Sequence, residues 1–226
     1  LTGTERTVVL ISHGFGSSKE SPTVQMLAAA LPPLGLGTLA FDFPAHGDSP
    51  VDGDMLSVGH CLDDLSAAEA RARALCPGAE IVYFASSFGA YLNLIYLATR
   101  PHAGDKAFLR SAAVEMPLLF RQRTPEEQAP LAARGYEMLD LGYARPIKVT
   151  QAFVDDLDAH DVFRLYRAGA ARVAIVHGDR DETAPVEAAV RFADRFGADL
   201  TIIPGGDHRL SIPGARERVL ALAAAF

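Results

Sequence analysis

Short apolar runs that alternate with helix-favouring stretches constrain the fold of this chain more than any other feature of its sequence. Six runs have the pattern of mostly buried strands: 7–14, 38–47, 81–87, 108–116, 172–179 and 199–208. Helix-favouring stretches lie between or after them, at 22–31, 57–75, 88–99, 186–196 and 215–226. Such alternation is typical of right-handed βαβ units. It predicts an α/β fold with a mainly parallel sheet of about six strands, flanked by helices on both faces.

One stretch, residues 117–160, interrupts this alternation. It is too long for a plain connection between a helix and a strand, which usually takes about 2 to 6 residues. It contains helix-favouring pieces and a segment at 147–153 (IKVTQAF) with an extended pattern. We therefore predict a core of residues 1–116 and 161–226 and a lid of residues 117–160 above the carboxyl edge of the sheet. The alternative is an insertion that only covers the surface and forms a small core of its own.

The segment IVYFASSFGAYLNLIYLA places two serines between a strand-like run and a helix. A tight strand-to-helix turn needs small residues two positions before and two positions after its apex. With Ser87 at the apex these are Ala85 and Gly89, whereas with Ser86 both would be phenylalanines. Ser87 is therefore the predicted apex of a nucleophile elbow, in which the turn presents the serine hydroxyl at the carboxyl end of the sheet. The alternative is a serine that only caps the following helix.

A nucleophilic serine needs a base that takes its proton and an acid that orients the base. On a sheet of this kind the acid and then the histidine follow the serine, each in a loop after a later strand. Asp181 is the better placed acid in HGDRDETAP, and Asp179 is predicted to support the turn. His208 is the only histidine beyond Asp181, and the glycines at 205–206 allow the chain to turn there. Each residue alone also fits a helix cap or an exposed loop position.

The oxyanion of an acyl-transfer intermediate needs two backbone N–H donors. One comes from the residue after the nucleophile, here Phe88, and the other from a loop after an earlier strand. The sequence HGFG at residues 13–16 provides such a loop, with Phe15 as the predicted donor. A glycine-rich turn without a ligand is the alternative. A phosphate loop is not indicated, because the Lys-Ser/Thr pair and the dinucleotide glycine spacing are both absent.

Five motifs together, HGFGSSKES, FDFPAHGDS, FASSFGA, HGDRDETAP and GGDHRL, resemble the α/β-hydrolase fold superfamily. The first two are similar to those of small bacterial cinnamoyl/feruloyl esterases and serine aminopeptidase-like hydrolases. The resemblance covers nearly the whole chain apart from the insertion, and it implies a lid after the sixth-strand region of the fold. It also implies a triad of Ser87, Asp181 and His208, with Phe15 and Phe88 as oxyanion donors.

The sequence departs from the family pattern at several positions. Ala85 stands where the family usually has glycine, and Ser86 stands where histidine, tyrosine or glutamine is common. Pro44 and Ala45 replace the Arg-Gly that related esterases often have. These differences put the subfamily in doubt, and not the chemistry. The strands that the family places before residue 7 are expected to be missing or not included.

The expected function is serine hydrolase cleavage of carboxylic esters through an acyl-enzyme, with aryl, cinnamoyl or short-to-medium acyl esters as substrates. A serine at the apex disfavours dehalogenase and epoxide-hydrolase chemistry, which uses an aspartate there. Peptidase, thioesterase, lysophospholipase or monoacylglycerol lipase activity on the same triad remains open, because one fold supports all of them. A non-catalytic binding protein is the alternative of another class.

Substrate contacts are expected from apolar residues of the insertion and of the first loop. The predicted substrate-binding residues are Phe15, Leu118, Phe120, Tyr136 and Tyr143, with Met138 as a further candidate. These side chains are suited to line a pocket for an aryl or medium acyl group. They are equally suited to form the core of the insertion itself. Three arginines of the insertion, Arg121, Arg123 and Arg134, are suited to an anionic substrate or to a solvated surface.

Composition limits the partners of the chain. Its 226 residues fit one domain, and a net charge of -7 argues against nucleic acid. Cys61 and Cys76 form no disulfide framework, and no cluster has zinc spacing, so no metal or cofactor is expected. Without a membrane span or a leader pattern, cytoplasmic residence is the default expectation. The sequence leaves open what precedes Leu1 and whether the chain is a monomer or a homodimer.

Overall fold

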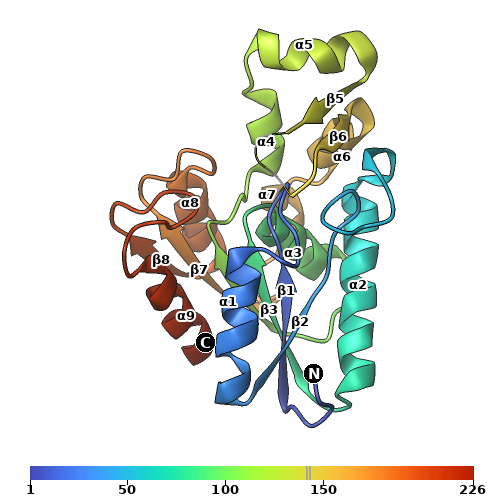
Figure 1. Cartoon of the computed structure of the whole chain (residues 1–226). Coiled ribbons are helices and arrows are strands. Elements are labelled where there is room, and N and C mark those ends of the chain that lie inside the picture. Colours follow the sequence, from blue (N-terminus) through green and yellow to red (C-terminus); the bar gives the residue numbers. More distant parts are fainter. Residues whose placement is uncertain (141, 143) are drawn as a thin grey trace.

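A six-stranded parallel sheet forms the centre of the fold (Figure 1). The structure is a computed structural model that describes residues 1–140, 142 and 144–226. The strands lie in the order β2-β1-β3-β4-β7-β8, and every described pairing between neighbours is parallel. Their bounds are β1 (Thr7–Ser12), β2 (Leu36–Ala40), β3 (Glu80–Ser86), β4 (Lys106–Arg110), β7 (Arg172–Gly178) and β8 (Asp199–Ile203). The predicted fold class is confirmed.

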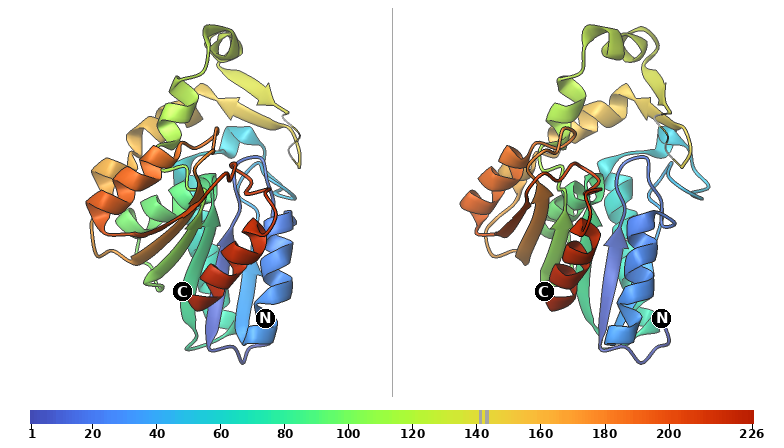
Figure 2. Two further views of the ribbon diagram at one scale, coloured as in Figure 1. Left: turned by 90° about the vertical axis from the view of Figure 1, so that its left-hand side faces the viewer. Right: turned by 60° about the vertical axis from the view of Figure 1, so that its left-hand side comes forward.

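Helices cover both faces of this sheet (Figures 1 and 2). One face carries α1 (Pro22–Ala30) and α9 (Ala215–Ala225), and the other carries α2 (Val58–Leu75), α3 (Phe88–Thr99) and α8 (Val186–Phe196). Successive strand residues point to opposite faces, so Val8 and Leu10 of β1 join one core while Val9 and Ile11 join the other. Because both faces are covered, the strands are apolar along their length, as the sequence runs indicate.

Three predicted strands end several residues before the apolar runs that predict them. β2 ends at Ala40, β4 ends at Arg110 and β8 ends at Ile203, and the residues that follow form loops at the carboxyl edge of the sheet. Ala45, Ser111 and Gly205 have φ angles of 65°, 48° and 73°. Such left-handed conformations interrupt a strand, so the remainder of each run forms loop structure that surrounds the candidate site.

The insertion lies beyond the carboxyl edge of the sheet (Figures 1 and 2). Its elements are α4 (Met116–Arg121), α5 (Pro125–Arg134), the antiparallel strands β5 (Tyr136–Leu139) and β6 (Ile147–Thr150), and α6 (Gln151–Ala159). The short α7 (Val162–Leu165) then leads back toward β7. The segment 147–153 is extended only in its first half, because the Thr150 side chain accepts a hydrogen bond from Phe153 N–H and so caps α6.

Several close contacts join the insertion to the loops of the core. The Lys148 carbonyl lies so close to Gly53, in the short 3₁₀ turn η2 (Gly53–Met55), that a Cβ there would be 1.7 Å from it. Lys148 also pairs with Asp54, at 2.6 Å between Nζ and Oδ1. Val58 N–H, at the start of α2, donates to Asp156 Oδ2 of α6 over 2.6 Å. The predicted boundaries of the insertion, 117–160, and its predicted role as a lid stay predictions.

One further short element lies outside the insertion: the 3₁₀ turn η1 (Pro32–Leu34) connects α1 to β2.

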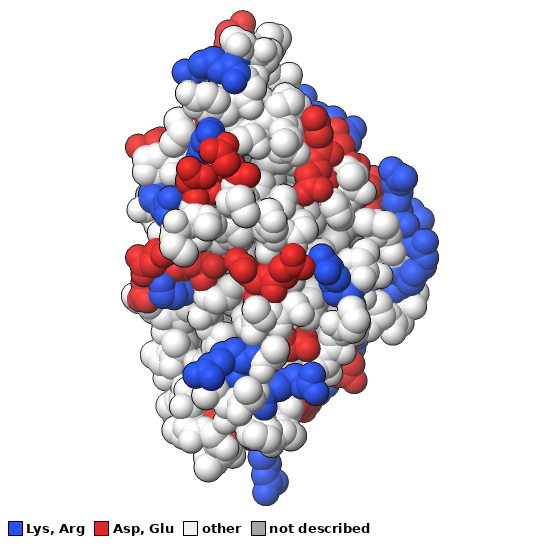
Figure 3. Space-filling view, turned by 90° about the vertical axis from the view of Figure 1, so that its right-hand side faces the viewer, with Lys and Arg blue, Asp and Glu red and all other residues white. Residues whose placement is uncertain are grey.

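Charged side chains of both signs are interspersed over the face shown in Figure 3, and a band of acidic groups crosses its middle. The net charge of the whole chain is -7, so acidic side chains outnumber basic ones. The prediction against a nucleic-acid partner stays a prediction. None of the helices in the described part of the chain is both long and apolar enough to cross a membrane.

Candidate active site

Ser87 stands at a strained turn between β3 and α3. Its φ and ψ angles are 52° and -115°, outside the regions that residues other than glycine usually occupy. A Cβ on Gly89 would lie 2.4 Å from the carbonyl oxygen of His13 and 2.7 Å from that of Ser12. Only glycine therefore allows the first turn of α3 to pack this closely on the end of β1. The requirement for small flanking residues, which selected Ser87 over Ser86, has this physical cause.

Ser87, His208 and Asp181 form a continuous chain of hydrogen-bonding groups. His208 Nε2 lies 3.0 Å from Ser87 Oγ, and His208 Nδ1 lies 2.8 Å from Asp181 Oδ2 and 3.0 Å from Oδ1. The Asp181 side chain has no exposed surface, whereas 21% of the His208 side chain is exposed. Three residues from the ends of three different strands thus meet at one edge of the sheet, with the imidazole open to solvent beside the hydroxyl.

Backbone groups fix the Asp181 carboxylate from its other side. The N–H groups of Thr183 and Ala184 donate to Oδ1 over 3.0 and 2.7 Å. Burial alone would raise the pKa of Asp181, but hydrogen bonds from His177, His208 and Ala184 hold that pKa well below its usual range. Asp181 is therefore a carboxylate at neutral pH, as an acid that orients an imidazolium must be.

Two glycines bring the loop that carries His208 against the loop that carries Asp181. A Cβ on Gly178 would lie 2.1 Å from the carbonyl oxygen of Gly206, so the two backbones touch where β7 ends. Asp179 Oδ1 accepts a hydrogen bond from Gly205 N–H over 2.6 Å. Gly205 has a φ of 73°, which favours glycine. Asp179 thus holds the turn before His208, in a different loop from its own.

The loop between β1 and α1, residues 13–21 (the β1–α1 loop), lies against Ser87. A Cβ on Gly14 would be 3.3 Å from Ser87 Cβ and 3.9 Å from Ser87 Oγ. Phe15 follows directly, and its ring centroid is 5.5 Å from that of Phe88. Phe88 is the first residue of α3, and the first N–H groups of a helix have no acceptor within the helix. The residues that carry both predicted oxyanion donors therefore lie beside Ser87, and their role as donors stays a prediction.

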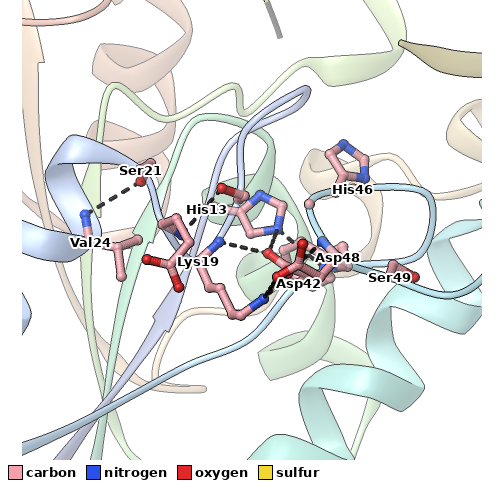
Figure 4. A network of polar contacts seen from close by, with 12 residues as sticks. His13, Lys19, Ser21, Val24, Asp42, His46, Asp48 and Ser49 are labelled. Carbon is pink, nitrogen blue, oxygen red and sulfur yellow. Dashed lines mark hydrogen bonds and ion pairs between the residues drawn. The ribbon is translucent and has the colours of Figure 1, made fainter. Parts of the chain in front are cut away.

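A polar network anchors the β1–α1 loop to the loop that follows β2 (Figure 4). Asp42 Oδ1 accepts from Lys19 N–H over 2.7 Å, and Asp42 Oδ2 pairs with Lys19 Nζ at 2.6 Å. Lys19 Nζ also pairs with Asp48, whose N–H donates to Asp42. His13 Nε2 accepts from Phe43 N–H over 3.2 Å. These contacts hold the segment that carries Phe15 at a fixed position beside Ser87.

Two histidines of this network are buried and neutral. Burial lowers the pKa of His13 to about 4, partly opposed by its hydrogen bond to the Gly14 carbonyl. Burial, together with the nearby His13, lowers the pKa of His46 to about 3. His46 Nδ1 lies 2.8 Å from the Pro44 carbonyl oxygen and therefore carries the ring proton. Neither ring is part of the hydrogen-bonded chain from Ser87 to Asp181.

The structure brings only some of the predicted substrate-binding residues together. Phe15 and Phe120 are in contact, with ring centroids 5.9 Å apart, and both pack on Phe153 of α6. Tyr136 lies on β5 beneath the cations of Lys148 and Arg134, at 4.9 and 5.2 Å from its ring centroid. Met138 is 53% exposed. Tyr143 lies outside the described residues.

A cavity of about 360 Å³ lies beside this site, between the loop after β4, the insertion and α8. Its apolar lining includes Leu118, one of the predicted substrate-binding residues, and Ala188 of α8. Two of its lining residues are bonded to the site: Ala113 N–H donates to the Ser87 carbonyl over 3.3 Å, and Ala184 N–H donates to Asp181. Glu115 and Arg191, paired at 2.6 Å, stand at its polar side.

Two charged or polar residues at this site were not predicted from sequence. His177, at the end of β7, has a fully buried side chain with Nε2 3.0 Å from Asp181 Oδ2. Arg110, at the end of β4, donates to the Arg209 carbonyl, and the negative charge of Asp181 stabilises its charged guanidinium. The sequence signal for His177 is a polar residue in an otherwise apolar run, four positions before Asp181.

Among the described residues no cluster of His, Cys, Asp or Glu is arranged to bind a metal ion, and Cys61 and Cys76 are free.

Comparisons with known proteins agree with this architecture. A family model described as serine aminopeptidase, S33, matches residues 3–152, well over half of the chain. A putative hydrolase from Agrobacterium vitis S4 is similar, with 22% identity, a TM-score of 0.81 and coverage of 97% of this chain and 87% of that one. Est1E from Butyrivibrio proteoclasticus, with ferulic acid bound, has 23% identity, a TM-score of 0.81 and coverages of 98% and 89%.

A more distant similarity is that to a monoacylglycerol lipase from Paleococcus ferrophilus, with 18% identity, a TM-score of 0.73 and coverages of 99% and 95%. No curated protein sequence matches the chain. At these identities the likeness to solved structures concerns the fold.

Proposed function

The chain belongs to the serine aminopeptidase S33 family of α/β hydrolases, and from this premise we propose that it cleaves carboxylic esters through a covalent acyl-enzyme. The observation that carries the proposal is the hydrogen-bonded chain from Ser87 through His208 to Asp181, built on a strained turn that only a tight strand-to-helix connection requires. A serine that merely capped α3 would not need this backbone conformation, and its side chain makes no capping hydrogen bond.

In the proposed mechanism, Ser87 Oγ attacks the ester carbonyl while His208 Nε2 takes the hydroxyl proton. Asp181 holds the proton on His208 Nδ1 and stabilises the imidazolium that forms. The N–H groups of Phe15 and Phe88 donate to the oxyanion of the tetrahedral intermediate. His208 then returns its proton to the leaving alkoxide, and water cleaves the acyl-enzyme by the same steps in reverse order.

Labelling by a fluorophosphonate probe tests the nucleophile directly. We expect the probe to modify Ser87 and no other serine, as mapped by peptide mass spectrometry, because the His208 ring lies 3.0 Å from the Ser87 hydroxyl as a base. A panel of 4-nitrophenyl esters, thioesters and aminoacyl 4-nitroanilides then separates the reaction classes. Folded protein that resists labelling and hydrolyses none of these substrates would favour a non-catalytic binding protein.

Peptidase activity is the second candidate function, and one observation favours it besides the family name. Glu115 and Glu187 line the cavity beside Ser87, where a carboxylate would bind the α-amino group of a peptide. Glu115, however, is already paired with Arg191 at 2.6 Å, and Glu187 is exposed to solvent. This pairing leaves the mostly apolar remainder of the cavity for an uncharged group, so ester hydrolysis is the better supported proposal.

We propose that the cavity binds the acyl group of the ester. Its volume of about 360 Å³ suits an aryl or a medium-length alkyl group. We expect Ala188→Phe to fill it from α8 and to lower kcat/KM for an octanoate ester relative to an acetate ester by about tenfold, since each buried methylene contributes about 0.8 kcal/mol. Kinetics on a 4-nitrophenyl ester series from acetate to octanoate measure this ratio.

Val190→Phe is the matched control, because Val190 lies on the same helix, is 38% exposed and does not line the cavity. It should leave the chain-length ratio unchanged. If Ala188→Phe alters acetate and octanoate hydrolysis equally, the acyl group binds elsewhere.

A further inference from the structure

His177 is a buried histidine that the mechanism described so far does not use. It lies in β7, its side chain has no exposed surface, and it precedes Asp181 by four residues. Nε2 is 2.7 Å from the Ala184 carbonyl oxygen and 3.0 Å from Asp181 Oδ2. Both neighbours are acceptors, so Nε2 must carry the ring proton.

The other ring nitrogen defines the charge of His177. Nδ1 is buried and has no hydrogen-bond partner in the described part of the chain. A proton on Nδ1 would therefore be a buried donor without an acceptor, which is costly. His177 is accordingly a neutral imidazole that donates from Nε2 alone. It differs in this respect from His208, whose two nitrogens face Asp181 and Ser87 and which must gain and lose a proton during acyl transfer.

His177 holds the β7–α8 loop (residues 179–185) at two points around the carboxylate. It binds the carbonyl of Ala184, the residue whose N–H donates to Asp181 Oδ1 over 2.7 Å. It also lies against Oδ2, the oxygen that is 2.8 Å from His208 Nδ1. His177 therefore supports Oδ1 through Ala184, whose carbonyl accepts from His177 and whose N–H donates to Oδ1, and it lies 3.0 Å from Oδ2.

We propose that His177 is a positioning residue of the catalytic site, a neutral donor that fixes the plane of the Asp181 carboxylate so that Oδ2 faces His208. The inference rests on the proposed function of Ser87, Asp181 and His208. It explains why a polar ring occupies a position within an apolar strand end: an apolar side chain would fill the space without leaving an unpartnered nitrogen, but it would release both contacts.

Arg110, at the end of the neighbouring strand β4, is a charged group that acts on Asp181, and it cannot replace the neutral His177. Its guanidinium donates to the Arg209 carbonyl, in the loop that carries His208. Its charge acts on Asp181 through space. A charge without a directed hydrogen bond favours the ionised carboxylate but does not orient it. Loss of His177 should therefore change the geometry of Asp181 while leaving it ionised.

A matched pair of variants separates the hydrogen bond from the shape of the side chain. His177→Gln keeps an amide donor near the position of Nε2, and His177→Met has nearly the same length without a donor. Hydrogen bonds to charged groups contribute about 1.5–3 kcal/mol, so we expect His177→Met to lower kcat by about 10- to 100-fold with little change in KM. His177→Gln should recover most of that loss.

Val176→Ala is the control for a purely structural effect. Val176 is the preceding residue of β7, and its fully buried side chain packs in the opposite core. It should lower the melting temperature and leave kcat near the wild-type value. Equal losses of kcat in the Met and Gln variants, or a wild-type kcat in His177→Met, would overturn the proposal.

A spectroscopic measurement without substrate tests the positioning role when the proposed activity is itself in question. The proton between His208 Nδ1 and Asp181 should give a low-field ¹H NMR resonance in the wild type and in His177→Gln. That resonance should move upfield or disappear in His177→Met, and an unchanged resonance there would contradict the proposal. Failure of fluorophosphonate to label the wild type would overturn the hydrolase mechanism alone.

Discussion

Ser87→Ala is expected to abolish ester turnover while leaving the fold intact. Loss of the nucleophile of a serine triad typically lowers kcat by about 10⁴-fold or more, because binding and the oxyanion donors alone retain little of the catalysis. The Ser87 side chain contacts His208, and no capping bond of α3 is lost with it. The measurement is steady-state hydrolysis of 4-nitrophenyl esters, with the melting temperature recorded in parallel.

Ser86→Ala is the matched control for this variant. Ser86 is the preceding residue, it is also a serine, and it is 8% exposed at the end of β3. We expect it to keep most of the wild-type activity and to be labelled at Ser87 as before. Retention of activity by Ser87→Ala, or its loss in Ser86→Ala alone, would mean that the nucleophile has been assigned to the wrong serine.

The assignment of the elbow shows how much of this site is encoded locally. A tight turn between a strand and a helix imposes steric limits within five residues, so Ala85 and Gly89 identify Ser87 without knowledge of the rest of the fold. Gly89 meets two backbone carbonyls of β1 and its loop. Likewise, loops after parallel strands meet at one edge, so the order of Ser87, Asp181 and His208 along the chain predicted their proximity. The family match confirms the resemblance drawn from these motifs.

Contacts between distant segments were harder to predict. The pairing of Lys19 with Asp42 joins residues 23 apart, and nothing in either segment alone indicates it. His177 was not predicted, because it precedes the acid and lies inside an apolar strand, although it contacts the same carboxylate. In the insertion, apolar residues were identified but not their directions: Phe120 packs into the core, whereas Met138 faces outward.

Mild acid is expected to destabilise the folded chain through two buried histidines, His13 and His46. Their pKa values fall from an ordinary 6.5 to about 4 and about 3. Below pH 6.5 the unfolded chain binds protons at both rings and the native chain does not, so the stability present above pH 6.5 is lost as the pH falls toward 4. Each ring contributes about 1.4 kcal/mol per pH unit within this window.

Together the two rings should lower the unfolding free energy by roughly 3 kcal/mol between pH 6 and pH 5, a large part of the 5–15 kcal/mol typical of a domain. Asp181 adds to the loss only below pH 3.8, where its lowered pKa begins to matter. Urea unfolding at a series of pH values measures the slope.

His46→Phe should reduce that slope by about half, because it removes one of the two titrating rings from an aromatic environment that accepts phenylalanine, beside Phe15 and Phe88. The exposed His60→Gln is the matched control for replacing a histidine. A slope that His46→Phe leaves unchanged would show that His46 does not stay neutral in the folded chain. Because His13 accepts from Phe43 N–H only as a neutral ring, its protonation near pH 4 should also loosen the loop that carries Phe15.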